Sequence, residues 1–258
     1  MKMQKVVAVV SFLGLGVVVA DAQVYPYPPP TPPPGYYYAP PPPPPAYIPP
    51  PAPYVPPSDS GPYFRMGIGP SFYQNGTLQQ FTTQGFSGPA NQPVSFNTGF
   101  TFNAVMGYAF NKYIGLDFET GYTEAGINNI PGYFSNNSYI YNIPLLVNAT
   151  VSLPIPHTIL VPYVGVGGGG SVSSFYGDSF GDQGGNFTAF GTESEFVYAY
   201  QAFAGLNFKL SRNFSLGIGY KYFATGDTTY SYPPGPNLNI SFKGVRTHSV
   251  LFTLQFNF

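Results

Sequence analysis

The sequence predicts an all-β protein: an eight-stranded antiparallel up-and-down transmembrane β-barrel, preceded by a proline-rich segment. Three observations lead to this fold. Residues 247–258 alternate polar and apolar side chains, as a strand with one lipid-facing side does. Seven earlier stretches share this strand character, and only 7% of the 258 residues are charged. No stretch after residue 22 has the length of a transmembrane helix, so a membrane-spanning chain must form a closed barrel.

The N-terminus has the features of a secretory signal peptide. Lys2 and Lys5 precede an apolar run at residues 6–19, and an A-x-A cleavage site follows at residues 20–22. The run is shorter than the roughly 20 apolar residues that span a bilayer. We therefore expect residues 1–22 to be a cleaved signal peptide rather than an anchor. The chain has no cysteine, which excludes a disulfide framework and a lipid-modified cysteine.

Residues 23–61 form a second segment that is rich in proline and tyrosine, with an unbroken proline run at 40–45. Proline fixes φ and lacks an N–H donor, so this segment is expected to be an extended polyproline II spacer. A plain semi-rigid linker is the favoured interpretation, and a docking track for a partner with an aromatic groove is the alternative. In the predicted topology this segment lies in the periplasm, within reach of the cell wall.

The barrel itself is predicted over residues 62–258, where clusters of Gly, Asn, Ser and Pro separate the strand-like stretches. In chain order the expected strands are 62–72, 98–110, 113–122, 138–153, 159–171, 196–210, 214–225 and 246–258. The connections alternate between short turns (111–112, 154–158, 211–213) and long polar loops (73–97, 123–137, 172–195, 226–245). This alternation is typical of outer-membrane barrels with periplasmic turns and extracellular loops. Closure requires the last strand to pair with the first.

Side-chain parity separates an apolar face from a polar face in these strands. In the expected strand 214–225, Leu216, Ile218 and Tyr220 share one face and Lys221 lies on the other. The apolar face is expected to contact lipid, and the charged residues are expected to point into the lumen. A secreted soluble ligand-binding barrel would show the reverse pattern and is therefore disfavoured.

Residues 199–223 resemble the sixth and seventh strands of OmpA-type and opacity-type outer-membrane barrels, and residues 161–167 resemble their fifth strand. The final strand resembles the closing strand of such barrels. The resemblance covers about 62–258 and implies the barrel rather than a biochemical activity. It also implies an assembly signal formed by the alternate apolar residues of the last strand: Phe252, Leu254, Phe256 and Phe258. We expect the chain to differ from OmpA itself by having no C-terminal peptidoglycan-binding domain.

Four charged residues are expected to point into the lumen by parity: Arg65, Asp117, Glu119 and Lys221. An eight-stranded barrel is only wide enough to be filled by side chains, so these residues should meet in a buried network. The favoured interpretation is a structural plug of compensated charges, because an unpaired buried charge is costly. The alternative is a gate whose ion pairs rearrange to let small solutes pass.

Two short motifs match enzyme patterns without the structural context that the chemistry needs. Residues 165–170 satisfy the dinucleotide-binding pattern, but no helix follows that could hold a pyrophosphate. Ser179 occupies a nucleophile-elbow pattern within an expected glycine-rich loop, again without a following helix. The nearby acidic residues lack calcium-loop spacing and are expected to form a solvated acidic loop: Asp178, Asp182, Glu193 and Glu195.

The two histidines give no catalytic pair. His248 and Ser249 are adjacent in a strand, so their side chains point to opposite faces and cannot share a proton. His157 lies in a proline-flanked turn. We therefore expect no enzymatic activity, no catalytic residues, no metal site and no cofactor.

The function predicted from the sequence is that of a small outer-membrane surface protein, structural or adhesive, in a Gram-negative bacterium. A narrow porin with a charge-gated lumen is the alternative, and a secreted soluble ligand-binding barrel is a second one. The expected partners are outer-membrane lipid and lipopolysaccharide, the assembly machinery through the last strand, and the cell wall through the proline-rich segment. Nucleic acid is excluded as a partner, because the formal net charge is -1 and no basic patch occurs.

Overall fold

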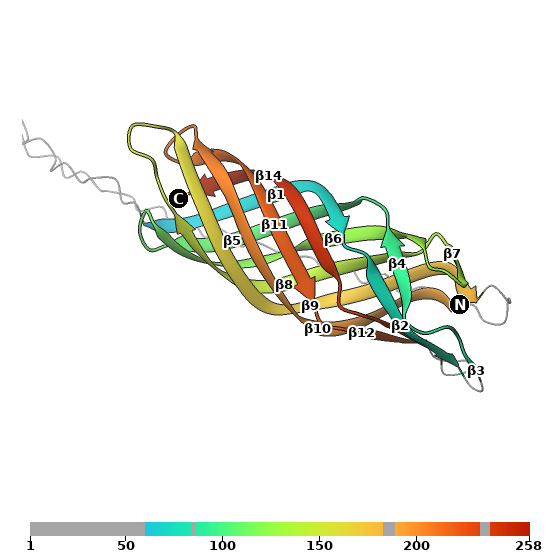
Figure 1. Cartoon of the computed structure of the whole chain (residues 1–258). Helices are drawn as coiled ribbons and strands as arrows, with labels where there is room; N and C mark the ends of the chain where they lie inside the picture. The colour runs from blue at the N-terminus through green and yellow to red at the C-terminus, as the bar shows by residue number, and fades with distance from the viewer. Residues whose placement is uncertain (1–59, 84–85, 183–188, 233–237) are drawn as a thin grey trace, which may run out of the picture. The chain divides into compact units, whose positions relative to one another are not determined.

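The structure is a computed structural model that describes residues 60–83, 86–182, 189–232 and 238–258, most of them in β-strands (Figure 1). The expected signal peptide and most of the proline-rich segment lie outside these residues. Where the chain is described, no helix is long and apolar enough to cross a membrane.

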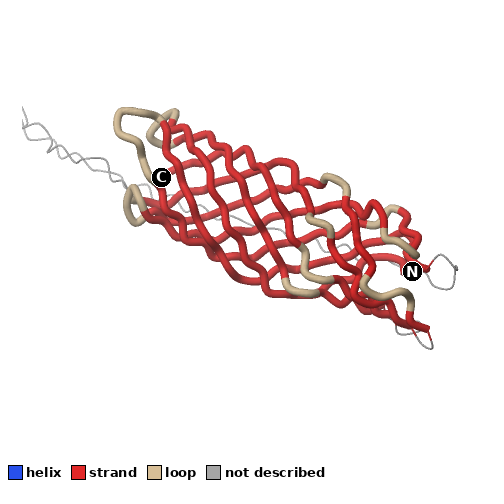
Figure 2. The backbone as a smooth tube through the Cα atoms, in the orientation of Figure 1, coloured by secondary structure: helices blue, strands red, loops and turns tan. Residues whose placement is uncertain are grey.

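Eight long strands form the wall of a closed antiparallel barrel, and they tilt around it as they cross (Figure 2). They are β1 (Gly61–Tyr73), β5 (Gly99–Ala109), β6 (Ile114–Asn129), β8 (Tyr139–Ser152), β9 (Leu160–Asp182), β10 (Ala189–Lys209), β11 (Phe214–Thr225) and β14 (Arg246–Asn257). Each pairs with the next in this order, and β14 pairs with β1. Phe64 lies opposite Phe256 across the closing pair. The predicted eight-stranded closed barrel is thus confirmed.

The two ends of the barrel differ. At one end, short turns join β5 to β6, β8 to β9 and β10 to β11, and both Ser60 and Phe258 lie at this short-turn end. Here the predicted strand boundaries agree with the structure to within two residues. At the opposite end β6, β9 and β10 continue well past their predicted limits. At about 3.3 Å per residue, strands of 21 and 23 residues are about twice as long as a membrane crossing requires.

The four long connections were predicted to be loops, and this prediction is wrong for most of their length. They contain β2 (Gly76–Thr83), β3 (Phe86–Ser87), β4 (Gln92–Phe96), β7 (Tyr133–Asn136), β12 (Thr228–Tyr232) and β13 (Leu238–Phe242). Antiparallel pairing links β12 to β13, β13 to β2, β2 to β3 and β4, and β4 to β6, while β7 pairs with β9. These six strands and the extensions of β6, β9 and β10 are called the cap below.

The cap forms because polar and apolar residues alternate along its strands, and the apolar side chains pack together in a buried cluster. Phe81, Phe175 and Tyr230 are among its fully enclosed side chains. The complete apolar cluster consists of Tyr73, Leu78, Phe81, Val94, Ala125, Ile127, Ile130, Tyr133, Ile140, Phe175, Tyr230, Ile240, Phe242 and Val245. Burial raises the pKa of the Tyr230 hydroxyl, which therefore stays neutral and shares a 2.9 Å hydrogen bond with Ser173 Oγ.

Polarity inverts along the barrel axis, as β6 shows. In its first part the inward side chains are charged, with Asp117 and Glu119 both buried, while Phe118 on the outside is 47% exposed. Beyond Thr123 the inward residues become apolar and Glu124 lies on the outside. The stretch before the inversion has about the length of a tilted membrane-crossing strand, 9 to 11 residues. The membrane band therefore ends where the cap begins.

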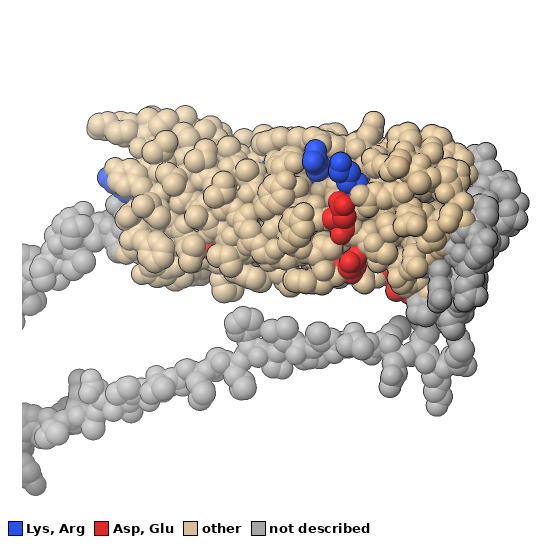
Figure 3. All heavy atoms as spheres, turned by 60° about the horizontal axis from the view of Figure 1, so that its bottom comes forward, with Lys and Arg blue, Asp and Glu red and all other residues tan. Residues whose placement is uncertain are grey.

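The outside of the membrane band is apolar and bordered by aromatic side chains. Between its two borders the band exposes branched aliphatic and aromatic residues that include Leu116, Val147, Val166, Ile218 and Phe252. Tyrosines gather at the cap border, where the Tyr139 and Tyr176 rings stack at 4.7 Å. Most of the surface visible in Figure 3 carries no charge, and the charged side chains lie mainly in one narrow zone. This exterior is that of a lipid-facing barrel and contradicts a soluble one.

We predict that Phe175→Ala will open the cap while leaving the barrel intact. Phe175 is fully buried, and its ring lies 5.6 Å from Phe242 and 5.8 Å from Tyr230. Its removal should cost about 3–5 kcal/mol of packing energy. Limited proteolysis of the folded protein in detergent should yield cleavage within the cap, with the heat-modifiable gel shift of the barrel retained. Phe102→Ala on the outer face is the matched control, and equal protease sensitivity of both variants would contradict an apolar cap core.

Candidate functional site

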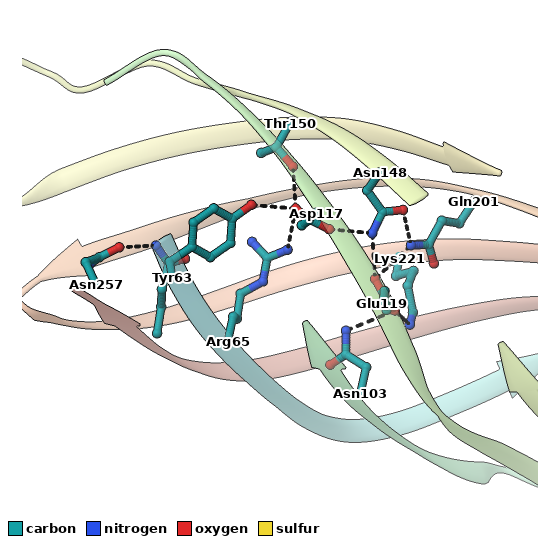
Figure 4. Close-up of polar contacts among 11 residues, drawn as sticks. Tyr63, Arg65, Asn103, Asp117, Glu119, Asn148, Thr150, Gln201, Lys221 and Asn257 are labelled. Atoms are coloured by element: carbon teal, nitrogen blue, oxygen red, sulfur yellow. Dashed lines mark hydrogen bonds and ion pairs between the residues drawn. The ribbon is translucent and has the colours of Figure 1, made fainter. Parts of the chain in front are cut away.

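The four charged residues predicted to face the lumen lie together in one buried network in the membrane band (Figure 4). Arg65 comes from β1, Asp117 and Glu119 come from β6, and Lys221 comes from β11. Lys221 Nζ lies 2.8 Å from Glu119 Oε1, and Arg65 lies 3.8 Å from Asp117 Oδ2. All four residues are at most 5% exposed. The network therefore contains two ion pairs, each of one cation and one carboxylate, inside a narrow lumen.

Neutral side chains complete the hydrogen bonding of Asp117. The Tyr63 hydroxyl donates to Asp117 Oδ2 at 2.5 Å, and Asn148 Nδ2 donates to Asp117 Oδ1 at 2.7 Å. Thr150 adds a longer bond of 3.3 Å. Hydrogen bonds to a charged acceptor are stronger than those between neutral groups. The negative charge of Asp117 is therefore compensated by these hydrogen-bond donors, even though its ion pair with Arg65 is long.

Glu119 is the centre of the second half of the network. Besides Lys221, it accepts hydrogen bonds from Gln201 Nε2 at 2.8 Å and from Asn103 Nδ2 at 3.0 Å. Gln201 Nε2 also lies 2.7 Å from the side-chain oxygen of Asn148, which joins the two halves. The donors come from strands around the whole wall, so the network links opposite sides of the barrel.

The five neutral members of the network were missed by the sequence analysis. They are Tyr63, Asn103, Asn148, Thr150 and Gln201. Parity alone places all of them on the inward face of predicted strands, so a search for inward-facing amides and hydroxyls would have found them. Their pairing with particular carboxylates depends on strand register, which the sequence does not specify.

Two aromatic rings lie close to the guanidinium of Arg65. Its Cζ lies 5.6 Å from the centre of the Tyr163 ring and 5.9 Å from that of Phe203, within the range of cation–π attraction. The glycines of β9 make room for these groups. A Cβ at Gly165 would collide with the Phe203 ring, and one at Gly167 would collide with the Asn148 side chain. The run at 165–170 is thus a strand packed against the lumen contents, without the helix that a nucleotide site needs.

The remaining candidate residues do not assemble into a reactive site. His248 lies on the outer side of β14 with its ring nitrogens next to Tyr220 and Gln74, whereas Ser249 is buried inside. His157 occupies a short turn with a φ of 61°. Ser179, predicted to lie in a loop, is within β9, although its side chain is outside the described part of the structure.

The acidic residues predicted in a loop also lie on strands. Glu193 and Glu195 belong to β10, and the backbone N–H of Thr229 donates to Glu195 Oε2. The side chains of Asp178 and Asp182 are not described. No group of three potential metal ligands occurs among the described residues.

The apolar residues of the expected assembly signal lie on the outer face of the closing strand. Phe252, Leu254 and Phe256 alternate along β14 toward lipid, and Phe258 follows the strand with 76% of its surface exposed. Their exposure is compatible with recognition from outside the barrel. Their role in assembly stays a prediction.

A closed barrel with an apolar exterior and compensated charges inside defines a transmembrane β-barrel protein. The family model described as outer membrane protein beta-barrel domain matches residues 58–258, and the chain belongs to this family. This confirms the resemblance to small outer-membrane barrels and places the protein in the outer membrane.

The chain is similar to solved structures of low sequence identity. OprG from Pseudomonas aeruginosa is 11% identical, with a TM-score of 0.50, over 78% of this chain and 98% of its own. Neisserial surface protein A is 16% identical, with a TM-score of 0.44, over 77% of this chain and 99% of its own. No match was found among curated proteins.

We predict that Lys221→Met will destabilise the barrel by about 3–5 kcal/mol, because Glu119 loses the cation with which it forms a 2.8 Å ion pair and stays buried. The double variant Glu119→Gln with Lys221→Met removes both charges and should recover part of this loss. Unfolding by urea from lipid vesicles measures the difference. If the double variant were as unstable as the sum of the two single variants, the pair would not be energetically coupled.

Proposed function

We propose that the protein is an integral surface protein of the outer membrane, with a sealed barrel and a cap that faces the outside of the cell. The observation that supports this function best is that side chains occupy the lumen at two successive levels. The charged network crosses the membrane band, and the apolar cluster fills the cap above it. A solute crossing the barrel would have to displace both layers. A sealed barrel acts through its exposed surface rather than through its lumen.

The proposed orientation follows from the two ends of the barrel. The short turns lie on the same side as the first and last residues of the described barrel. This side corresponds to the periplasmic side in barrels of this kind. The opposite side carries the cap, whose surface presents polar side chains on paired strands. A folded cap offers a fixed surface to a partner, so binding there would carry less ordering cost than binding to flexible loops. The structural or adhesive role is therefore assigned to the cap.

The partners follow from the same arrangement. Outer-membrane lipid contacts the apolar band, and lipopolysaccharide would surround the tyrosine border below the cap. The assembly machinery would meet the outer face of β14. The proline-rich segment would enter the periplasm next to Ser60, toward the cell wall.

Labelling of intact cells tests the orientation. Ser231 is exposed on β12 of the cap, and Asn213 is exposed in a short turn. Because the chain has no cysteine, Ser231→Cys and Asn213→Cys each introduce a single thiol. A membrane-impermeant maleimide should label the first variant in intact cells and the second only after the outer membrane is permeabilised. The reverse pattern would place the cap in the periplasm and refute the proposed function.

Conductance measurements separate the sealed surface protein from a narrow porin. We expect no steady single-channel conductance for the wild-type protein in planar bilayers. Glu119→Ala removes the acceptor of four side-chain donors at the network centre, yet the apolar cap remains in place. Its conductance should therefore stay at the wild-type level. Stable openings that change with Glu119→Ala would instead support the charge-gated porin.

A further inference from the structure

The short-turn end of the barrel contains a cavity of about 320 Å³ that the surface function does not use. The volume falls within the range of small-molecule sites, about 300–1,000 Å³. Arg65 forms part of its lining at the side of the charged network, and Tyr63 and Tyr163 contribute aromatic walls. The cavity is thus bounded by the network on the inside and by the short turns at its mouth.

The charged side chains that line this cavity are all basic, whereas the carboxylate of Phe258 also borders it and Asp117 lies behind Arg65. The exposed side chains of Lys112, Lys209 and Arg212 line its mouth, and no acidic side chain is among the described residues that line it. Lys112, Lys209 and Arg212 form no ion pair within the described residues. Three cations converging on a low-dielectric recess raise the local concentration of anions. The mouth is therefore suited to a multiply charged anion.

The cavity also contains buried polar groups without sufficient partners. Arg65 is 5% exposed and has five N–H donors, yet its only polar partner in the described structure is Asp117, at 3.8 Å. Asn207 is 8% exposed, and its Oδ1 has no hydrogen-bond partner among the described residues. Buried polar groups are normally satisfied, and a ligand or ordered water in the cavity can supply the missing partners. Spare guanidinium donors favour an oxyanion, and a free amide oxygen favours a hydroxyl.

We propose that this cavity binds a phosphate group. Arg65 is the inner ligand of the phosphate, and Lys209 and Arg212 are its charge partners at the mouth. Asn207 accepts a hydrogen bond from a protonated phosphate or from a sugar hydroxyl. Arginine presents its donors in a planar fork that fits phosphate oxygens. The cavity exceeds the size of inorganic phosphate and accommodates a phosphate monoester. The phosphate can come from a free metabolite or from a phospholipid headgroup at the membrane surface.

Titration of the full-length protein tests this site. The protein is placed in nanodiscs of phosphatidylcholine and titrated with inorganic phosphate and with glycerol 3-phosphate, with chloride as the background ion. We expect saturable binding by calorimetry, and a chemical-shift change at the Arg65 side-chain N–H and the Asn207 amide. The double variant Lys209→Gln with Arg212→Gln should weaken binding by about fivefold or more. Both side chains are exposed, so the variant should retain the fold.

Lys243→Gln is the matched control, because Lys243 is an exposed cation on the cap that does not line this cavity. It should leave phosphate binding unchanged. Nanodiscs of phosphatidylglycerol distinguish the source of the phosphate: a shift at Arg65 without added ligand identifies a headgroup, and a shift only on titration identifies a free ligand. The proposal is overturned if Arg65 is unmoved in both lipids, or if Lys243→Gln weakens binding as much as the double variant does.

Discussion

Closure of the β14–β1 pair is the constraint on which the rest of the structure depends. An open edge in lipid would leave a row of backbone N–H and C=O groups without partners, each at a cost of several kcal/mol. With Phe64 opposite Phe256, the register of the closing pair is fixed, and the inward and outward faces of the last strand continue into those of the first. Along each strand, alternate side chains then point to lipid and to the lumen. The apolar exterior and the polar interior are consequences of the same closed ladder.

The narrowness that closure imposes explains the lumen contents. With eight strands the lumen is narrow enough to be crossed by side chains, so inward charges are neutralised by side chains from other strands. Asp117 and Glu119 on one strand are compensated by Arg65 and Lys221 from two others. Amides then bridge the halves and tie strands that are not neighbours in the sheet. Glycines such as Gly165 leave the volume that these larger side chains need.

Parity made much of the fold predictable from the sequence, whereas register and context limited the rest. The eight wall strands and the inward direction of Lys221 follow from a period of two, which needs no knowledge of neighbours. The pairing of Arg65 with Asp117 rather than Glu119 depends on how β1, β5 and β6 align, which the sequence does not show. The cap was mistaken for loops because its polar residues face outward and its short strands gain stability only from packing together. A segment such as 238–242 is not stable as an isolated strand.

The inversion of polarity at Thr123 gives the two ends of the molecule separate physical characters. Below it, the interior is polar because lipid outside forces the apolar side chains outward. Above it, water surrounds the wall, so the same alternation places apolar residues inside and builds a core of the kind found in soluble proteins. The cap and the phosphate cavity lie on opposite sides of the charged network and share no lining residue. A partner bound to the cap can affect the cavity only through strands that continue across the network, of which β6, carrying Asp117 and Glu119, is the most direct.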